Sequence, residues 1–97
     1  MQRENTREGI DAALNDFMTH MRHKLLLTRH RDHWKELPLA LLLERVKEEV
    51  VELEEALASG DRKKVVRECA DVANFLMFIA DNEQWAGSRE WDSHEGR

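Results

Sequence analysis

A chain of 97 residues fits one domain, because single domains usually run from about 50 to 250 residues. Charged residues make up 36% of it, with one Pro and no Tyr, which suits exposed helix faces and argues against a sheet protein. Its net charge of -5 argues weakly against non-specific binding of nucleic acid. No apolar stretch approaches the roughly 20 residues of a membrane span, and the first residues lack the apolar segment of a secretory signal. Cys69 is the only cysteine, so no intramolecular disulfide can form and we expect a cytoplasmic protein.

The first predicted helix covers residues 6–27. Its apolar residues recur at helical spacing: Ile10, Leu14, Phe17, Met21 and Leu25. Asn5, with Glu8 three residues later, fits an N-terminal capping arrangement. Residues 28–37 have no clear period and are rich in Arg and His, so they are predicted to form a connection.

Two further helices are predicted, one beginning at Pro38 and one spanning about residues 62–82. Pro38 fits the first turn of a helix, where its missing N–H costs nothing. Gly60 can end the second helix in the left-handed conformation, and Asp61 can cap the third. A connection this tight predicts that the two helices are antiparallel neighbours.

The third predicted helix becomes apolar on all sides over residues 72–80, where Asn74 is the one polar residue. An amphipathic helix in a three-helix monomer would not need apolar groups all round. Either the tail covers the second face or another subunit does, and we favour the subunit. The sequence thus predicts an all-α fold, a short helical bundle completed by oligomerisation. Residues 1–97 would form one helical domain, of which residues 85–97 would be a flexible tail.

Two pairs of carboxylates lie on the second and third predicted helices: Glu49 with Glu52, and Glu68 with Asp71. Residues three apart on a helix lie on neighbouring sides, one turn along, so each pair forms one acidic patch. On a helical wheel, Glu49 lies about 60° and Glu52 about 120° from the centre of the apolar stripe. Glu68 lies about 100° from the apolar stripe of its own helix. Antiparallel packing through these stripes would bring both pairs to the same border of the interface.

Four carboxylates at one border would repel one another strongly without a cation. Oxygen ligands without Cys or His suit a hard ion, so Mg²⁺ or Mn²⁺ fits better than zinc. The alternative is a solvated acidic face, since Glu44, Glu54 and Glu55 make the second helix rich in Glu throughout. The border position of Glu49 and the second pair on the adjoining helix bring the metal site level with this alternative.

The sequence around these carboxylates reads Glu-Glu-x-x-Glu at residues 48–52 and Glu-x-x-Asp-Val-Ala-Asn-Phe at residues 68–75. In spacing, in apolar phasing and in the trailing Asn74, this pattern resembles the MazG-like nucleoside triphosphate pyrophosphohydrolases, an all-α group. The resemblance covers about residues 39–81, and more loosely the connection ending in Trp34. Some phage and mobile-element relatives carry Gly-Gly-Trp before the second helix, where this chain has Asp-His-Trp at residues 32–34.

The resemblance implies an activity and a set of site residues. It implies that the four paired carboxylates bind Mg²⁺, with Mn²⁺ as the alternative ion, and that Glu48 orients or deprotonates the attacking water. It implies cleavage between the α and β phosphates, from a nucleoside or deoxynucleoside triphosphate to the monophosphate and pyrophosphate. It also implies a homodimer or homotetramer. The alternative function is that of a non-catalytic helical oligomer that binds a partner.

Four more residues are candidate substrate contacts: Arg31, Trp34, Lys35 and Asn74. Trp34 could stack on a base or plug the end of the bundle. Asn74 could bond a base or sugar, or bridge to a partner helix. Arg31 and Lys35 belong to a basic cluster that would either contact the triphosphate or simply suit a helix C-terminus and solvent; its other members are Arg22, Lys24 and Arg29.

Overall fold

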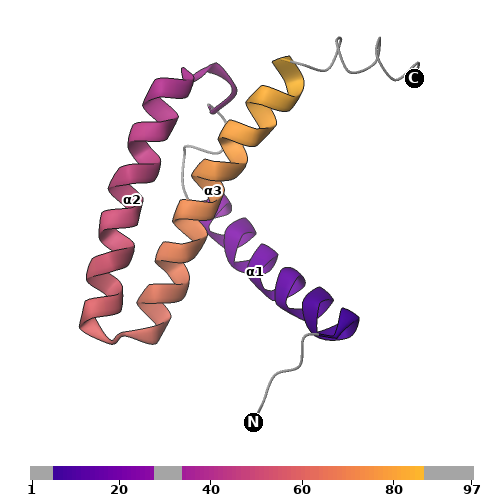
Figure 1. Ribbon diagram of the computed structural model, residues 1–97, viewed down its shortest axis with the longest axis vertical. Coiled ribbons are helices and arrows are strands. Elements are labelled where there is room, and N and C mark those ends of the chain that lie inside the picture. Colours follow the sequence, from indigo (N-terminus) through magenta and orange to yellow (C-terminus); the bar gives the residue numbers. More distant parts are fainter. Residues whose placement is uncertain (1–5, 28–33, 87–97) are drawn as a thin grey trace.

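The computed structural model describes residues 6–27 and 34–86 of the chain, and within them every regular element is a helix (Figure 1). Three of these are α-helices: α1 (Arg7–Leu27), α2 (Leu39–Ser59) and α3 (Arg62–Ala86). A short 3₁₀ turn, η2 (Trp34–Glu36), precedes α2. The predicted all-α fold is therefore confirmed.

The tight turn between α2 and α3 forms as the sequence predicts. Gly60 adopts φ 76° and ψ 5°, in the left-handed region, and its N–H donates to the carbonyl of Leu57 at 3.3 Å. The N–H of Lys64 donates to Oδ1 of Asp61 at 3.2 Å, which caps α3. As a result α2 and α3 run antiparallel and side by side (Figure 1).

Helix α1 packs against α3 and not against α2, over the described residues, and crosses α3 at a steep angle (Figure 1). Its start is capped by Thr6, whose Oγ1 accepts from the N–H of Gly9 at 3.0 Å. Asn5, the predicted cap, lies outside the described residues. Near the other end of α1, Nδ2 of Asn74 donates to the carbonyl of Met21 at 3.1 Å. This bond fixes α1 to the middle of α3.

Two helix ends differ from the prediction. Pro38 lies just before α2, in extended backbone with φ -66° and ψ 148°, rather than in its first turn. Its fixed φ suits this position too, because the helix begins only at the next residue. Helix α3 ends at Ala86 rather than near residue 82, so residues 85 and 86 are helical. The rest of the expected tail, residues 87–97, lies outside the described residues.

The short turn η2 closes one end of the α2–α3 pair through Trp34. The indole stacks on Phe78 with 4.7 Å between ring centroids and 8° between planes. Its Nε1 donates to Oδ2 of Asp81 at 3.1 Å, and Nδ2 of Asn82 donates to the Trp34 carbonyl at 2.9 Å. Trp34 thus plugs the bundle end, one of its two predicted roles.

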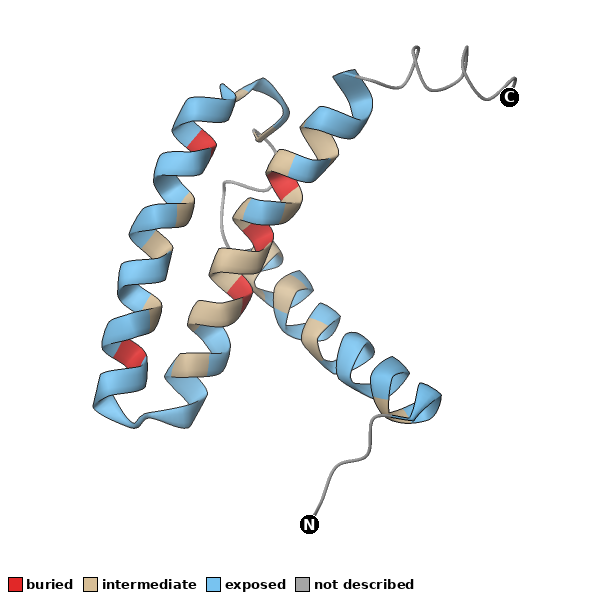
Figure 2. Cartoon of the chain, viewed as in Figure 1, coloured by how far each residue is buried: buried red, intermediate tan, exposed pale blue. Residues whose placement is uncertain are grey.

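The core of the described helices is small and lies along the facing sides of α2 and α3 (Figure 2). The buried apolar residues of the described helices are Leu42, Ala56, Ala70 and Phe78. By contrast Leu76, within the apolar stretch of α3, is 51% exposed. No helix in the described part of the chain is long and apolar enough to cross a membrane.

Candidate metal centre

Three carboxylates from two helices meet at the border of the α2–α3 interface. Glu49 of α2, Glu68 and Asp71 of α3 each offer an oxygen, and these oxygens lie within 4.8 Å of one another. Glu68 and Asp71 are three residues apart on α3, so they lie one turn apart on the same side. All three side chains are half-buried.

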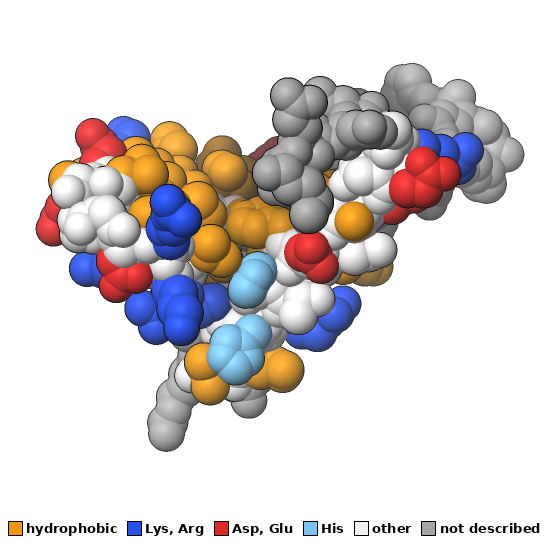
Figure 3. Space-filling model, turned by 90° about the horizontal axis from the view of Figure 1, so that it is seen from below, with side chains coloured by type: hydrophobic (Ala, Val, Ile, Leu, Met, Phe, Trp, Pro, Cys, Tyr) orange, Lys and Arg blue, Asp and Glu red, His pale blue; other side chains and the backbone are white. Residues whose placement is uncertain are grey.

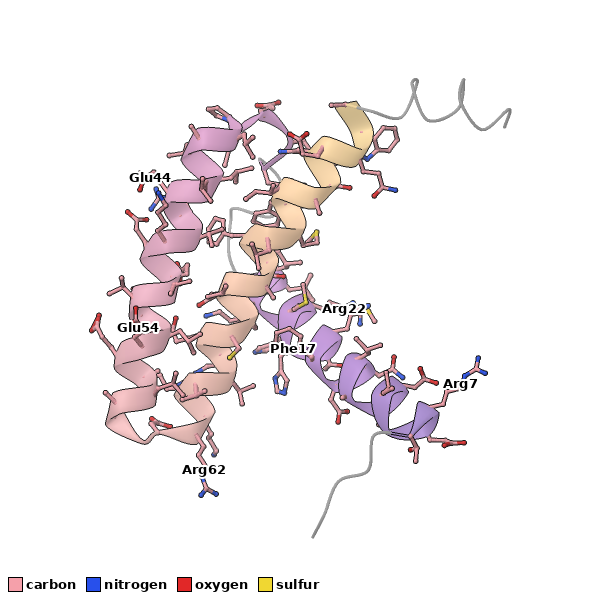
Figure 4. All side chains as sticks on the ribbon, in the orientation of Figure 1. Arg7, Phe17, Arg22, Glu44, Glu54 and Arg62 are labelled. Atoms are coloured by element: carbon pink, nitrogen blue, oxygen red, sulfur yellow. The ribbon has the colours of Figure 1, made fainter. Side chains whose placement is uncertain are left out.

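Glu52, the fourth predicted ligand, is exposed and lies outside this group of three. It lines a neighbouring cavity of about 140 Å³ together with Lys64 and Glu68. Its negative charge still acts on the cluster, because it raises the pKa of both Glu49 and Glu68. Glu52 therefore stands at the edge of the site. The other Glu residues of α2 include Glu44 and Glu54, which lie on its exposed surface (Figure 4).

Two carboxylates of the cluster, Glu49 and Glu68, have a raised pKa. The pKa of Glu49 is raised to about 8, first by burial, then by a hydrogen bond with Glu52 and by the negative charges of Glu52, Asp71 and Glu68. Burial also raises the pKa of Glu68, followed by the charges of Asp71 and Glu52. A site in which like charges are crowded and partly desolvated favours the arrival of a cation.

The cluster also contains buried oxygens without a hydrogen-bond partner. Oε2 of Glu49 and Oε2 of Glu68 are both in this state. Most buried polar atoms in folded proteins have a partner, so each exception requires an explanation. Hard divalent cations take oxygen ligands of this kind, and the donor set contains no Cys or His. The three carboxylates therefore fit a divalent ion.

One cation of the chain reaches the cluster from α1. Nζ of Lys24 lies 3.2 Å from Oδ2 of Asp71, and the two side chains are 25% and 21% exposed. Lys24 stands in the last turn of α1, where a cation also suits the helix dipole. Its charge lowers the pKa of Glu68, as does that of Lys64.

A cavity of about 230 Å³ opens beside the carboxylates, between α1, α2 and α3. Its lining consists of Lys24, Leu25, Arg45, Glu49, Asp71, Asn74, Phe75 and Phe78. Asn74 is only 4% exposed; its Nδ2 is held by Met21, whereas its Oδ1 is buried without a partner. The cavity therefore combines two cations, two acids of the cluster and a fixed amide.

A sequence model described as phosphoribosyl-ATP pyrophosphohydrolase matches residues 14–84, well over half of the chain. The chain belongs to this family. The phosphoribosyl-ATP pyrophosphohydrolase family is part of the MazG-like all-α nucleoside triphosphate pyrophosphatase superfamily, so the resemblance found in the carboxylate motif is confirmed. As a member of the phosphoribosyl-ATP pyrophosphohydrolase family, the chain is an enzyme that hydrolyses an acid anhydride and releases pyrophosphate. No curated protein and no solved structure matches it significantly.

Glu48, the predicted base, lies on the exposed surface of α2 and outside the carboxylate cluster. Its side chain is 61% exposed, and Oε2 pairs with Nη1 of Arg45 at 3.1 Å. Arg45 lines the cavity, whereas Glu48 itself is not among the lining residues. Its predicted role as the base stays a prediction.

The residues predicted to contact the substrate lie in different places. Asn74 lines the carboxylate cavity. Trp34 is one ring removed from it, behind Phe78, and Nζ of Lys35 lies over its indole at 5.9 Å from the centroid. Lys35 also lines a separate cavity of about 510 Å³ that shares no residue with the first. Arg31 lies outside the described residues.

Two cations of the cavity were not singled out from the sequence. Arg45 could have been found, because it precedes Glu49 by four residues and so shares its side of α2. Lys24 was one member of a basic cluster of five, and helical periodicity alone gives no reason to prefer it. Only the packing of α1 on α3 separates it from the others.

Proposed function

We propose that the chain hydrolyses nucleoside and deoxynucleoside triphosphates between the α and β phosphates, with Mg²⁺ as the metal and Mn²⁺ as the alternative. The observation that carries this proposal is the group of three carboxylate oxygens within 4.8 Å, with unpartnered buried oxygens on Glu49 and Glu68. Its position beside a cavity with cations in the lining supports the same proposal, because a triphosphate is strongly anionic. The products would be a nucleoside monophosphate and pyrophosphate.

Each part of the site has a role in this proposal. Glu49, Glu68 and Asp71 would hold the ion, with Glu52 at the edge of the same charge cluster. When bound, Mg²⁺ neutralises charge on phosphate oxygens and makes water more acidic. Glu48 would accept a proton from the attacking water, as a carboxylate beside a nucleophile can.

Asn74 would recognise the sugar or base of the nucleotide. Its Nδ2 already donates to the Met21 carbonyl, which fixes the direction of the amide. Its unpartnered Oδ1 can then accept a hydrogen bond from a hydroxyl or an amino group of the substrate. A rigid acceptor of this kind discriminates well, since a ligand without the matching donor leaves it unpaired.

A second candidate substrate is phosphoribosyl-ATP, which the description of the family names. It carries a triphosphate, so the same bond would be cleaved by the same residues. The cavity of about 230 Å³ is smaller than the roughly 300–1,000 Å³ typical of small-molecule sites. We therefore propose that a second copy of the chain, in a homodimer or homotetramer, completes the substrate site. We place the enzyme in the cytoplasm, which suits the free thiol of Cys69.

The test is release of pyrophosphate from a panel that contains the ribo- and deoxyribonucleoside triphosphates and phosphoribosyl-ATP, with Mg²⁺, with Mn²⁺ and with EDTA. We expect ion-dependent release from at least one triphosphate, and none from the Glu49→Gln variant. Turnover of phosphoribosyl-ATP alone would decide for the second candidate substrate. Absence of release from every compound would contradict the proposal.

A further inference from the structure

Lys24 is more sheltered than a surface lysine usually is, and it lies against the carboxylate cluster. Its Nζ contacts Asp71, a member of the carboxylate cluster, and both side chains are largely sheltered. The ammonium also faces the cavity that Glu49 and Asn74 line. One turn earlier on α1, the bond from Asn74 to the Met21 carbonyl holds the helix in place. The position of Lys24 is therefore fixed by the same residues that shape the site.

A divalent ion at the cluster would compete with Lys24 for the charge of Asp71. Both are cations, and a carboxylate that binds a metal ion has less negative charge left for an ammonium. The Lys24 side chain is long and carries three donors on a flexible stem, so it can turn toward another anion in the same cavity. The anion that the proposed reaction brings there is the polyphosphate of the substrate.

We propose that Lys24 is a phosphate-binding residue, paired with Asp71 in the metal-free enzyme and transferred to the β and γ phosphates when the metal ion and nucleotide bind. This inference rests on the proposed function and adds a residue to it. The competing explanation is that the ion pair only fastens α1 to α3. The two explanations differ in what they predict for ligands, so binding measurements separate them.

The experiment measures binding by calorimetry, with Mn²⁺ or Mg²⁺ alone and then with inorganic pyrophosphate in the presence of Mg²⁺. Pyrophosphate is used because it requires no knowledge of the preferred base. The variants are Lys24→Met, Lys24→Arg and, as a matched control, Lys64→Met. Lys64 is an exposed lysine whose charge also acts on Glu68, but it lies on the neighbouring cavity. Circular dichroism verifies that each variant is folded.

We expect Lys24→Met to have opposite effects on the two ligands. Without pyrophosphate its affinity for the ion should rise by up to about fivefold, because a competing ion pair is lost. Its Mg²⁺-dependent affinity for pyrophosphate should fall about tenfold or more, the usual effect of losing a hydrogen bond to a charged group. Lys24→Arg should retain most of the pyrophosphate affinity, and Lys64→Met should leave it within about twofold.

Two results would overturn the inference, and they are distinguishable. If wild type and Lys24→Met bind pyrophosphate equally while wild type remains active, the pair with Asp71 serves only to fasten α1. If the wild-type chain shows no Mg²⁺-dependent binding of pyrophosphate, Lys24 has no phosphate to bind and the inference fails; the proposed function fails with it only if pyrophosphate release from the triphosphates is absent as well.

Discussion

Glu49 occupies a position that burial and electrostatics alone would disfavour. It is half-buried at a helix interface, one of its oxygens has no partner, and three other carboxylates act on it. A Gln or a Leu would relieve this repulsion at no cost to the helix. Strongly perturbed acids in a cleft are typical of functional sites, so the local cost is consistent with a role in binding an ion.

Replacing Glu49 by Gln should separate stability from activity. The variant keeps the side-chain volume but removes a charged ligand, so hydrolysis should fall by at least about a hundredfold, since even indirect metal partners cost 10–100-fold. Helical content should be unchanged, and the metal-free variant should be at least as stable as wild type. Asp71→Asn should lose activity similarly. Pyrophosphate release and thermal melting in EDTA measure both effects, and a wild-type rate would remove these residues from the site.

The stability of the metal-free protein should fall as pH rises. The pKa of Glu49 is about 8 in the folded chain, above its ordinary value of 4.5. Between these two values the folded chain holds a proton that the unfolded chain has released, so folding is favoured most at the acid end. In EDTA, we expect a higher melting temperature at pH 5 than at pH 8.5.

Two controls define the origin of this pH effect. Glu49→Gln cannot titrate, so its melting temperature should change less over the same window. Saturating Mg²⁺ should oppose the fall, because the ion binds the deprotonated carboxylates and its stabilising effect grows with pH. A melting temperature that rises from pH 5 to pH 8.5 in EDTA would contradict the assignment of a raised pKa to Glu49.

Replacing Glu48 by Gln should mainly lower turnover, whereas replacing Glu52 by Gln should mainly lower the affinity for Mg²⁺. Loss of a general base lowers turnover by roughly two to four orders of magnitude, and Glu48→Gln should show this with little change in Mg²⁺ affinity. Glu52→Gln should weaken the binding of Mg²⁺ more, because the charge of Glu52 acts directly on Glu49 and Glu68. Glu44→Gln and Glu55→Gln are the controls. If Glu48→Gln matches them in rate and Mg²⁺ affinity, the base is elsewhere.

At the scale of elements, features that depend on a few adjacent residues were predictable from the sequence. The turn between α2 and α3 forms with Gly60 left-handed and Asp61 as cap, because both residues act through local backbone geometry. The predicted ends of the helices were less accurate. Helix α3 continues to Ala86, since residues 83–86 include no Gly or Pro that would stop a helix, although all four are exposed.

The position of α1 could not be read from the sequence. Its apolar period predicts a helix and a buried side but says nothing of which neighbour it covers, since α1 meets α3 through contacts distant along the chain. The wheel could therefore place the carboxylates of α2 and α3 at one border but could not select Lys24. The sequence likewise could not decide whether Trp34 stacks on a base or plugs the bundle end. Its stacking on Phe78, which the structure shows, favours the second role.

Gly60→Ala should destabilise the α2–α3 turn through backbone strain alone. The φ of 76° disfavours any L side chain by about 1–2 kcal/mol, while an added Cβ would meet no atom within 4 Å. We expect a fall in melting temperature of about 4–8 °C, as a loss of about 1 kcal/mol gives in a domain of this size. Gly60→Asn should lower the melting temperature less, because Asn tolerates the left-handed backbone region better than Ala does. Equal melting temperatures for Gly60→Ala and wild type would contradict this account.

The molecule as a whole presents more apolar surface than its own described helices cover. Hydrophobic side chains gather over α2 and α3 in the view from below (Figure 3). Exposed large hydrophobic residues of these two helices include Leu39, Leu41, Leu43, Val50, Val51, Leu57, Val66 and Leu76. Large contiguous apolar patches in such a protein mark interaction sites, which agrees with the predicted subunit contact.

We expect the protein to sediment as a dimer or larger species at micromolar concentration. Leu76→Glu should shift it toward the monomer, because Leu76 is half-exposed in the apolar stretch of α3 and a buried unpaired charge is costly. Gln84→Glu, which adds the same charge at an exposed position of α3, should leave the assembly intact. A wild-type monomer at this concentration would contradict the prediction. If the Leu76→Glu monomer keeps its helical content and its affinity for Mn²⁺ but loses pyrophosphate release, the partner copy completes the substrate cavity.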